Sequence, residues 1–193
     1  MKAPARQAAN DGHITCRPPA VADGPEIWRL VNNIDTLDTN SAYCYLVLCR
    51  HFSNTCAIAE CDGRLVGFTT GYLVPGMDTT LYIWQIGIGR EFRGRGIATH
   101  LIMEILRRDA CRSVRYLEAT VSPSNTASAA LFNSLAHRLG AECETGTCFD
   151  TALFPGKAHE DENLLRIGPF GWAAVHALKN TEQNQGREVQ ITR

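Results

Sequence analysis

The sequence predicts one domain of mixed helices and strands, fold class α+β, on three observations. The chain has 193 residues, a length that suits a single domain with a sizeable core. Segments rich in β-branched and aromatic residues are interspersed with segments whose apolar residues recur at helical spacing. No internal repeat interrupts this order. We expect a domain at 13–170 between a flexible N-terminal tail at 1–12 and a C-terminal tail at 171–193.

The first part of the domain combines a short strand, two helices and a hairpin. Asp23 is the expected N-cap of the first helix, since its short polar side chain precedes an apolar-periodic segment. Asp62-Gly63 is a strong turn signal and places the hairpin. In order, the predicted elements are a strand at 13–17, helices at 23–34 and 41–52, and paired strands at 55–61 and 64–74.

The second part continues with strands and helices in alternation. Leu81 to Ile88 is rich in β-branched and aromatic residues and predicts a strand. The helix after it has an apolar arc that includes Ile97, Leu101 and Ile105. Gly140 is expected to end a later helix, since glycine readily adopts the left-handed backbone found there. The remaining predicted elements are a strand at 116–121, a helix at 124–139 and a last strand at 164–167.

A glycine-rich turn joins the strand at 81–88 to the helix that starts at Ile97. It reads Arg93-Gly94-Arg95-Gly96-Ile97-Ala98, followed by Thr99. Glycines let the backbone approach a ligand closely, and the free N–H groups of a helix N-terminus point outward. The arrangement is typical of a site for an anionic group, although a plain strand-to-helix turn would show the same pattern.

Two other phosphate-binding motifs fit this turn poorly. A Walker loop needs Lys-Ser or Lys-Thr after its second glycine, and Gly96 is followed by Ile97-Ala98. The dinucleotide fingerprint needs a third glycine or alanine where this chain has Thr99.

The pattern that does fit, Arg/Gln-x-x-Gly-x-Gly/Ala, resembles the pyrophosphate loop of the GNAT acetyltransferases. The resemblance extends from about residue 14 to 170 and implies the GNAT fold, a central mixed, twisted sheet flanked by helices. It also implies acetyl-CoA as cosubstrate. The implied contacts are made by the loop at 93–99, by the strand residues Ile86, Gly87 and Ile88, and by Asn125 and Phe132 on the later helix.

Phe132 departs from the pattern of the GNAT family. Many members have a tyrosine there that protonates the departing thiolate, and phenylalanine has no proton to donate. Phe132 also fits the apolar arc that its helix shares with Leu131, Leu135 and Leu139, so packing alone accounts for it.

Five separated segments, in order, resemble one group of GNAT enzymes more closely. This is the family of L-2,4-diaminobutyrate acetyltransferases, which acetylate the 4-amino group of their substrate in ectoine biosynthesis. The resemblance implies the same substrate, cytoplasmic location, a role in osmoadaptation and a homodimer. The segments are Thr36–Tyr45, Trp84-Gln85, Leu117–Asn125, Leu153–Gly156 and Arg166–Phe170.

A small diamino acid needs carboxylates for its amines and hydrogen-bond donors for its carboxylate. We expect Asp38, His159 and Glu160 to supply polar contacts, and Tyr43 and Trp84 to supply walls with polar tips. Each has an alternative. Asp38 could cap the helix near Ser41, Trp84 could belong to the core, and 159–162 could be a solvated loop.

Acetyl transfer to an amine requires a base. An alkylamine with a pKa of about 10.4 is protonated near neutral pH and must lose a proton before it attacks. The candidates are Asp38, Glu118 or Glu160, acting through water, and His159; for Glu118 an exposed position on its strand is slightly favoured. A backbone N–H of residues 86–88 would stabilise the oxyanion, and Gly87 would mark a bulge that separates two strands.

Composition argues against several other classes of protein. A net charge of −1 argues against nucleic-acid binding, and no apolar run reaches the roughly 20 residues of a membrane span. The eight cysteines form no Cys-x-x-Cys pair, so we expect free thiols and no metal. The alternatives left open are a GNAT enzyme acting on a polyamine, another small amine or a protein N-terminus, and a non-catalytic acyl-CoA-binding module.

Overall fold

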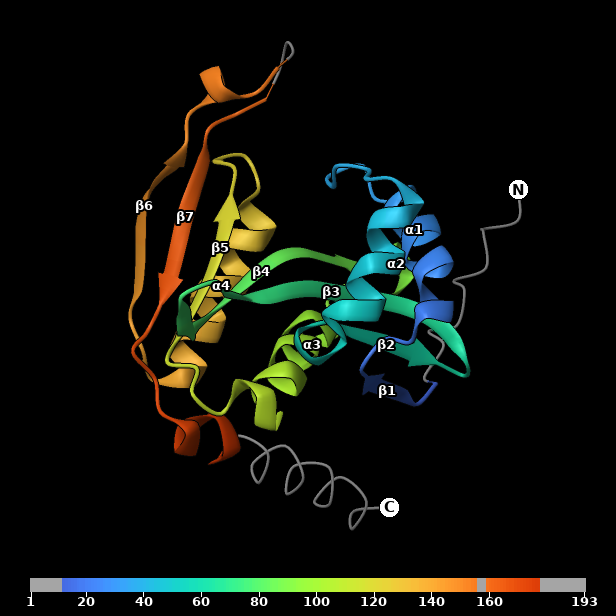
Figure 1. Cartoon of the computed structure of the whole chain (residues 1–193), viewed down its shortest axis with the longest axis horizontal. Coiled ribbons are helices and arrows are strands. Elements are labelled where there is room, and N and C mark those ends of the chain that lie inside the picture. The colour runs from blue at the N-terminus through green and yellow to red at the C-terminus, as the bar shows by residue number, and fades with distance from the viewer. Residues whose placement is uncertain (1–11, 156–158, 178–193) are drawn as a thin grey trace, which may run out of the picture.

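The computed structural model describes residues 12–155 and 159–177, which form a seven-stranded mixed sheet with helices on both faces (Figure 1). The order across the sheet is β1-β2-β3-β4-β5-β7-β6. The strands are β1 (Ile14–Arg17), β2 (Ala57–Cys61), β3 (Arg64–Val74), β4 (Met77–Ile88), β5 (Tyr116–Val121), β6 (Cys143–Phe149) and β7 (Glu162–Ile167). The α-helices are α1 (Gly24–Val31), α2 (Ala42–His51), α3 (Ile97–Leu106) and α4 (Thr126–Leu139). The predicted α+β class is confirmed.

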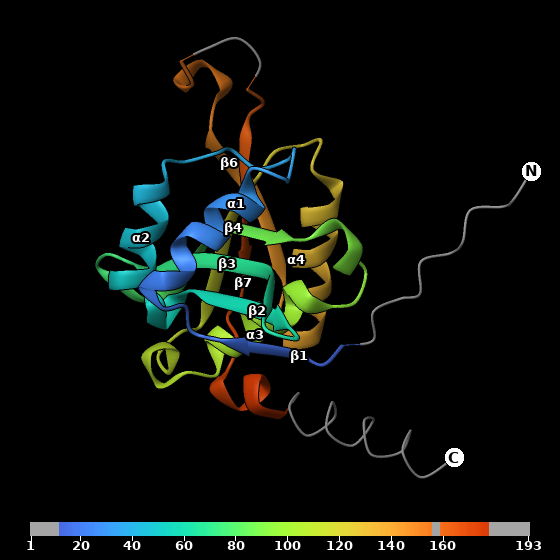
Figure 2. The same ribbon diagram turned by 90° about the vertical axis from the view of Figure 1, so that its right-hand side faces the viewer.

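Two apolar clusters hold the helices on the sheet. Helices α1 and α2 pack on one face through Ile27, Tyr45 and Phe68, whereas α3 and α4 bury their apolar arcs on the other face (Figure 2). Leu101 and Leu135 are fully buried in this larger cluster. Burial of apolar area on both faces is the main force that stabilises such a three-layer arrangement.

Strands β4 and β5 form the only parallel pair within the described residues, and they separate along their length. Their pairing covers Thr80–Ile83 opposite Tyr116–Ala119. Beyond Ile83, β4 continues to Ile88 without β5 as a partner. On that side β4 has no strand partner beyond Ile83, near the carboxyl ends of both strands.

The bulge in β4 lies at Trp84 and not at Gly87, which corrects the expectation from sequence. Thr70 pairs with Gln85 and Gly71 with Ile83, so Trp84 is the extra residue. Gly87 keeps its partner Phe68. Gly87 instead allows close packing, because a Cβ at this position would lie 2.6 Å from the Phe68 ring.

Several local predictions are confirmed. The β2–β3 hairpin turns at Asp62-Gly63, both with positive φ, and Gly140 ends α4 in the left-handed region. The strand at 116–121 matches β5. Strand β6 was not predicted, because Cys143–Phe149 is a mostly exposed edge strand without an apolar face.

Asp23 is the N-cap residue of α1, as predicted, but its side chain makes no capping hydrogen bond. Its carboxylate instead accepts bonds from Arg17, at 2.7 Å, and from the Ala20 N–H, because Arg17 reaches it from β1. Arg17 also pairs with Glu60 of β2.

The packed chain extends past the boundary expected at residue 170. Residues 172–177 are helical, and Val175 is buried in the larger cluster. The rest of the expected C-terminal tail and all but one residue of the expected N-terminal tail lie outside the described residues. All eight cysteines are unpaired thiols, and no helix in the described part of the chain is long and apolar enough to cross a bilayer.

Candidate active site

Two adjoining cavities lie where β4 and β5 separate. We call the first, of about 310 Å³, the polar cavity, because carboxylates, an imidazole and amides line it beside aromatic rings. We call the second, of about 510 Å³, the glycine-loop groove, because it runs along the turn before α3. Both are lined by Thr36, Ile86, Asn125 and Ser128, so the two cavities meet at these residues.

The glycine-loop groove gathers nearly all residues that the sequence assigned to a cosubstrate. Gly94 and Gly96 have φ of 76° and 75°, a left-handed backbone that favours glycine. No heavy atom would lie within 4 Å of a Cβ at either position, so the space above both backbones is open. The predicted residues that line the groove are Ile86, Gly87, Ile88, Arg93, Gly94, Gly96, Ile97, Ala98, Thr99 and Asn125.

Two predicted cosubstrate residues lie elsewhere. Arg95 does not line the groove; its guanidinium stacks over the Phe92 ring, 5.1 Å from the centroid, and donates to the Glu91 carbonyl. Phe132 is buried and lines the polar cavity. Asn125 combines two roles, since it lines both cavities while its Oδ1 accepts the Ser128 N–H at the start of α4.

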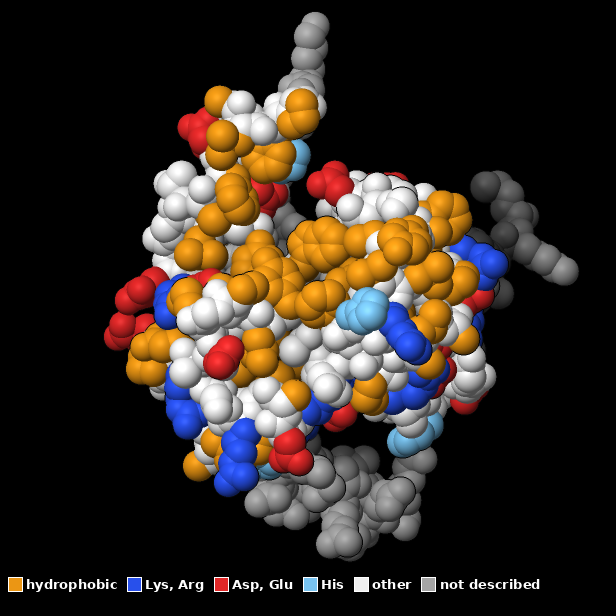
Figure 3. Space-filling view, viewed as in Figure 1, with side chains coloured by type: hydrophobic (Ala, Val, Ile, Leu, Met, Phe, Trp, Pro, Cys, Tyr) orange, Lys and Arg blue, Asp and Glu red, His pale blue; other side chains and the backbone are white. Residues whose placement is uncertain are grey.

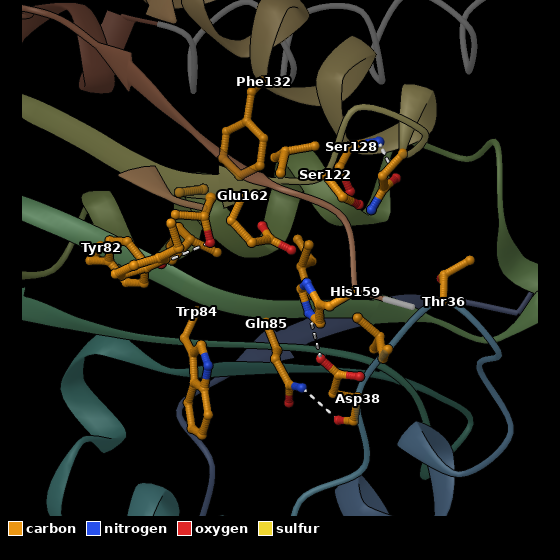
Figure 4. A pocket seen from close by; sticks show the side chains of 18 of the residues that line it. Thr36, Asp38, Tyr82, Trp84, Gln85, Ser122, Ser128, Phe132, His159 and Glu162 are labelled. Carbon is orange, nitrogen blue, oxygen red and sulfur yellow. Dashed lines mark hydrogen bonds and ion pairs between the residues drawn. The ribbon is translucent and has the colours of Figure 1, made fainter. Parts of the chain in front are cut away.

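Three ionisable side chains meet at the mouth of the polar cavity. His159 Nε2 lies 3.8 Å from Asp38 Oδ2, and Glu162 at the start of β7 also lines the cavity. In Figure 4 the carboxylates of Asp38 and Glu162 both point toward the His159 ring. The ring stacks on Phe154 with centroids 3.6 Å apart, and its Nδ1 lies 2.7 Å from the Glu160 carbonyl. These contacts fix the imidazole with Nε2 toward the cavity.

The floor of the polar cavity is built on the bulge in β4. Trp84, the bulged residue, lines the cavity with its side chain partly exposed. The Gln85 N–H donates to the Thr70 hydroxyl at 3.2 Å. Tyr82 also lines the cavity and bonds Thr120 Oγ1; burial raises the pKa of the Tyr82 hydroxyl, which therefore remains protonated at neutral pH.

Tyr43 does not line either cavity and is 73% exposed, which corrects its predicted place in the wall. Residues two apart on a helix differ by about 200°, so Tyr43 and Tyr45 face opposite sides of α2. Tyr45 is the one that faces inward. Its hydroxyl donates to Gln85 Oε1 at 3.0 Å, below the cavity floor.

Glu118 and Glu160 are likewise absent from the cavity lining. Glu118 faces Arg166 across the β5–β7 pair and forms an ion pair with it. Glu160 is exposed and accepts the Ser124 N–H at 3.0 Å, and hydrogen bonding to the side chain and backbone of Ser124 lowers the pKa of its carboxyl. Both carboxylates are engaged in structural contacts and are not placed to act as bases in the cavity.

Sequence reasoning missed Glu162 and the Tyr45–Gln85 pair. Glu162 lies in the same acidic stretch as Glu160, and only the start of β7 decides which carboxylate faces inward.

Within the described residues no group of three His, Cys, Asp or Glu side chains has the arrangement of a metal site.

The outer face around the cavity is markedly apolar. Figure 3 shows a band of hydrophobic side chains that runs from the β6–β7 end of the molecule toward α2. The large hydrophobic side chains that remain exposed include Tyr43, Trp84, Phe149 and Leu153.

Known proteins resemble this chain in sequence over most of its length. The sequence profile of the acetyltransferase (GNAT) family matches residues 25–136, more than half of the chain. A curated L-2,4-diaminobutyric acid acetyltransferase of Halalkalibacterium halodurans is 47% identical over 160 residues, covering 83% of this chain and 84% of that protein. One from Shouchella clausii is 46% identical over 157 residues, covering 81% and 88% respectively.

One solved structure has the same overall fold as this chain. It is a diaminobutyrate acetyltransferase from Paenibacillus lautus, in complex with its substrate L-2,4-diaminobutyric acid and coenzyme A. The TM-score is 0.80 at 38% identity, covering 82% of this chain and 96% of that chain. The chain therefore belongs to the GNAT family of acetyltransferases and, within it, to the family of L-2,4-diaminobutyric acid acetyltransferases.

Proposed function

We propose that this protein transfers the acetyl group of acetyl-CoA to the 4-amino group of L-2,4-diaminobutyrate, giving N4-acetyl-L-2,4-diaminobutyrate for ectoine biosynthesis. The observation that carries the proposal is the junction of a carboxylate-lined polar cavity with a glycine-loop groove where β4 and β5 separate. The relatives named above, one of them bound to both ligands, support it.

The residues of the groove fit the pyrophosphate of coenzyme A. Gly94 and Gly96 leave open space above backbone N–H groups at the N-terminus of α3, and Arg93 lines the same groove. Such N–H groups and a nearby guanidinium stabilise phosphate charge. When bound, acetyl-CoA supplies the thioester that the amine attacks.

The polar cavity orients the amine and takes its proton. An ammonium group binds between the carboxylates of Asp38 and Glu162, and Trp84 supplies an apolar wall. Glu162, directly or through a water molecule, accepts the proton from the reacting ammonium. The free amine nitrogen then bonds to the carbonyl carbon, and a backbone N–H of residues 86–88 stabilises the oxyanion. The C–S bond breaks, and the second proton of the attacking nitrogen passes, through water, to the departing thiolate, which gives the amide and the thiol of coenzyme A. The departing thiolate needs no strong acid because its pKa is about 8.5.

The test is an acetylation assay with purified protein, acetyl-CoA and L-2,4-diaminobutyrate, with coenzyme A release measured and the acetylated nitrogen located by NMR. We expect N4-acetyl product and much lower kcat/KM for a polyamine or an N-terminal peptide. Release with those amines alone would favour another GNAT activity. Binding of acetyl-CoA without turnover of any amine would favour the non-catalytic module.

We further propose that the protein works as a cytoplasmic homodimer in osmoadaptation. Eight unpaired thiols suit a reducing compartment, and the exposed hydrophobic band suits contact with a second subunit. Sedimentation of the purified protein tests the dimer directly. A monomer at micromolar concentration would contradict it.

A further inference from the structure

A buried hydrogen-bonded relay runs from α2 to the mouth of the polar cavity. The Tyr45 hydroxyl donates to Gln85 Oε1 at 3.0 Å, and Gln85 Nε2 donates to the Asp38 carbonyl at 2.9 Å. The relay links the core of the α1–α2 layer to the loop that carries the Asp38 carboxylate. In Figure 4 the Gln85 amide lies to the left of Asp38, and a dashed line marks its bond to the Asp38 carbonyl.

The direction of each bond in the relay is fixed by chemistry. A backbone carbonyl can only accept, so the Gln85 amide must turn its NH₂ group to Asp38 and its oxygen to Tyr45. The Tyr45 hydroxyl must then donate. It does so from a fully buried position, where an unpaired hydroxyl is costly. Burial also raises the pKa of this hydroxyl, which keeps its proton in place.

The loop has a second anchor at Asn40. Trp28 Nε1 donates to the Asn40 carbonyl at 3.1 Å, two residues farther along. The Asp38 side chain itself is 89% exposed, so packing does not hold it in place. Apart from the solvent-weakened contact with His159, its position above the cavity therefore depends on how its backbone is held.

We propose that Tyr45 and Gln85 are positioning residues that hold Asp38 over the polar cavity for the amine substrate. The inference rests on the proposed function. The relay does not touch the glycine-loop groove, since neither Tyr45, Gln85 nor Asp38 lines it. Disrupting the relay should therefore lower kcat/KM for the amine substrate and leave the KM for acetyl-CoA unchanged.

The test is Tyr45→Phe, which removes one hydroxyl and keeps the ring packed edge-on against Phe68. We expect kcat/KM for diaminobutyrate to fall about five- to tenfold, the scale of one buried hydrogen bond, with the KM for acetyl-CoA unchanged. In an Asp38→Ala background the same change should have less than a twofold effect, because both act through one carboxylate.

Tyr116→Phe is the matched control, since Tyr116 is partly buried in β5 and lines neither cavity. A melting temperature for each variant checks folding; if Tyr45→Phe does not fold, Gln85→Leu breaks the same relay. An unchanged kcat/KM, an equal loss for acetyl-CoA, or a full effect in the Asp38→Ala background would overturn the inference. If the wild type does not acetylate diaminobutyrate, the proposed function fails instead.

Discussion

His159 Nε2 lies 3.8 Å from Asp38 Oδ2, and this contact connects the segment before β7 to the loop between α1 and α2 across the mouth of the polar cavity. Figure 1 shows a gap between β6–β7 on one side and α1–α2 on the other. Because the Asp38 carboxylate is largely exposed, water weakens the pair, and the pair by itself stabilises the fold by less than about 1 kcal/mol.

Asp38→Asn should therefore act on substrate binding and not on stability. We expect the KM for diaminobutyrate to rise about tenfold, since one charge-assisted hydrogen bond to the ammonium is lost, with a melting temperature within about 2 °C. Asp35→Asn, in the same loop, is the control because Asp35 does not line the cavity. Equal effects of the two variants would show that Asp38 has no specific role.

Glu162→Gln should lower kcat more than any other single carboxylate change. The amide keeps the size of the side chain but cannot accept the amine proton, and a general base contributes about 10²- to 10⁴-fold. Glu144→Gln on the exposed edge strand β6 is the matched control. The measurement is kcat at saturating concentrations of both substrates across pH 6 to 10; a Glu162→Gln variant with wild-type kcat would exclude this base.

Gly96→Val should raise the KM for acetyl-CoA at least tenfold. Valine at φ of 75° is strained by about 1–2 kcal/mol, and its side chain would occupy the open space above the loop. Gly146→Val, at an uncrowded position without positive φ in β6, should leave this KM unchanged. A folded Gly96→Val variant with normal acetyl-CoA kinetics would separate the groove from cosubstrate binding.

Phe132→Tyr should leave kcat within about threefold, or under 0.7 kcal/mol of barrier. The reason is that the thiolate leaves without strong acid assistance, so a phenol in the polar cavity adds little. Steady-state kcat with a melting temperature as the folding check measures this. A gain of tenfold or more would mean that protonation of the leaving group limits the rate.

Asp23→Asn should destabilise the fold at neutral pH by about 1 kcal/mol. Hydrogen bonding to Arg17 lowers the pKa of the Asp23 carboxyl below its ordinary value of 3.8. The stabilisation is therefore fully present above pH 3.8 and is lost as pH falls through the lower folded-state pKa. Urea unfolding at pH 7 and pH 3 checks it, and the difference between wild type and variant should shrink at the lower pH.

Local features could be predicted from the sequence because they depend on neighbouring residues. The turn at Asp62-Gly63, the end of α4 at Gly140 and the glycine turn before α3 each follow from the backbone preference of one or two residues. The glycine loop and its position between a strand and a helix also pointed to the correct family.

The tertiary structure decided which polar residues reach the cavity. Glu162 and not Glu160 faces inward because β7 begins at Glu162, and Tyr45 and not Tyr43 reaches Gln85 because α2 turns its two tyrosines to opposite sides. Glu118 is occupied by Arg166 through a strand register that no local pattern specifies. Strand register and helix rotation depend on contacts between segments far apart in the chain, so a single sequence gives the set of candidates and the packed fold selects among them.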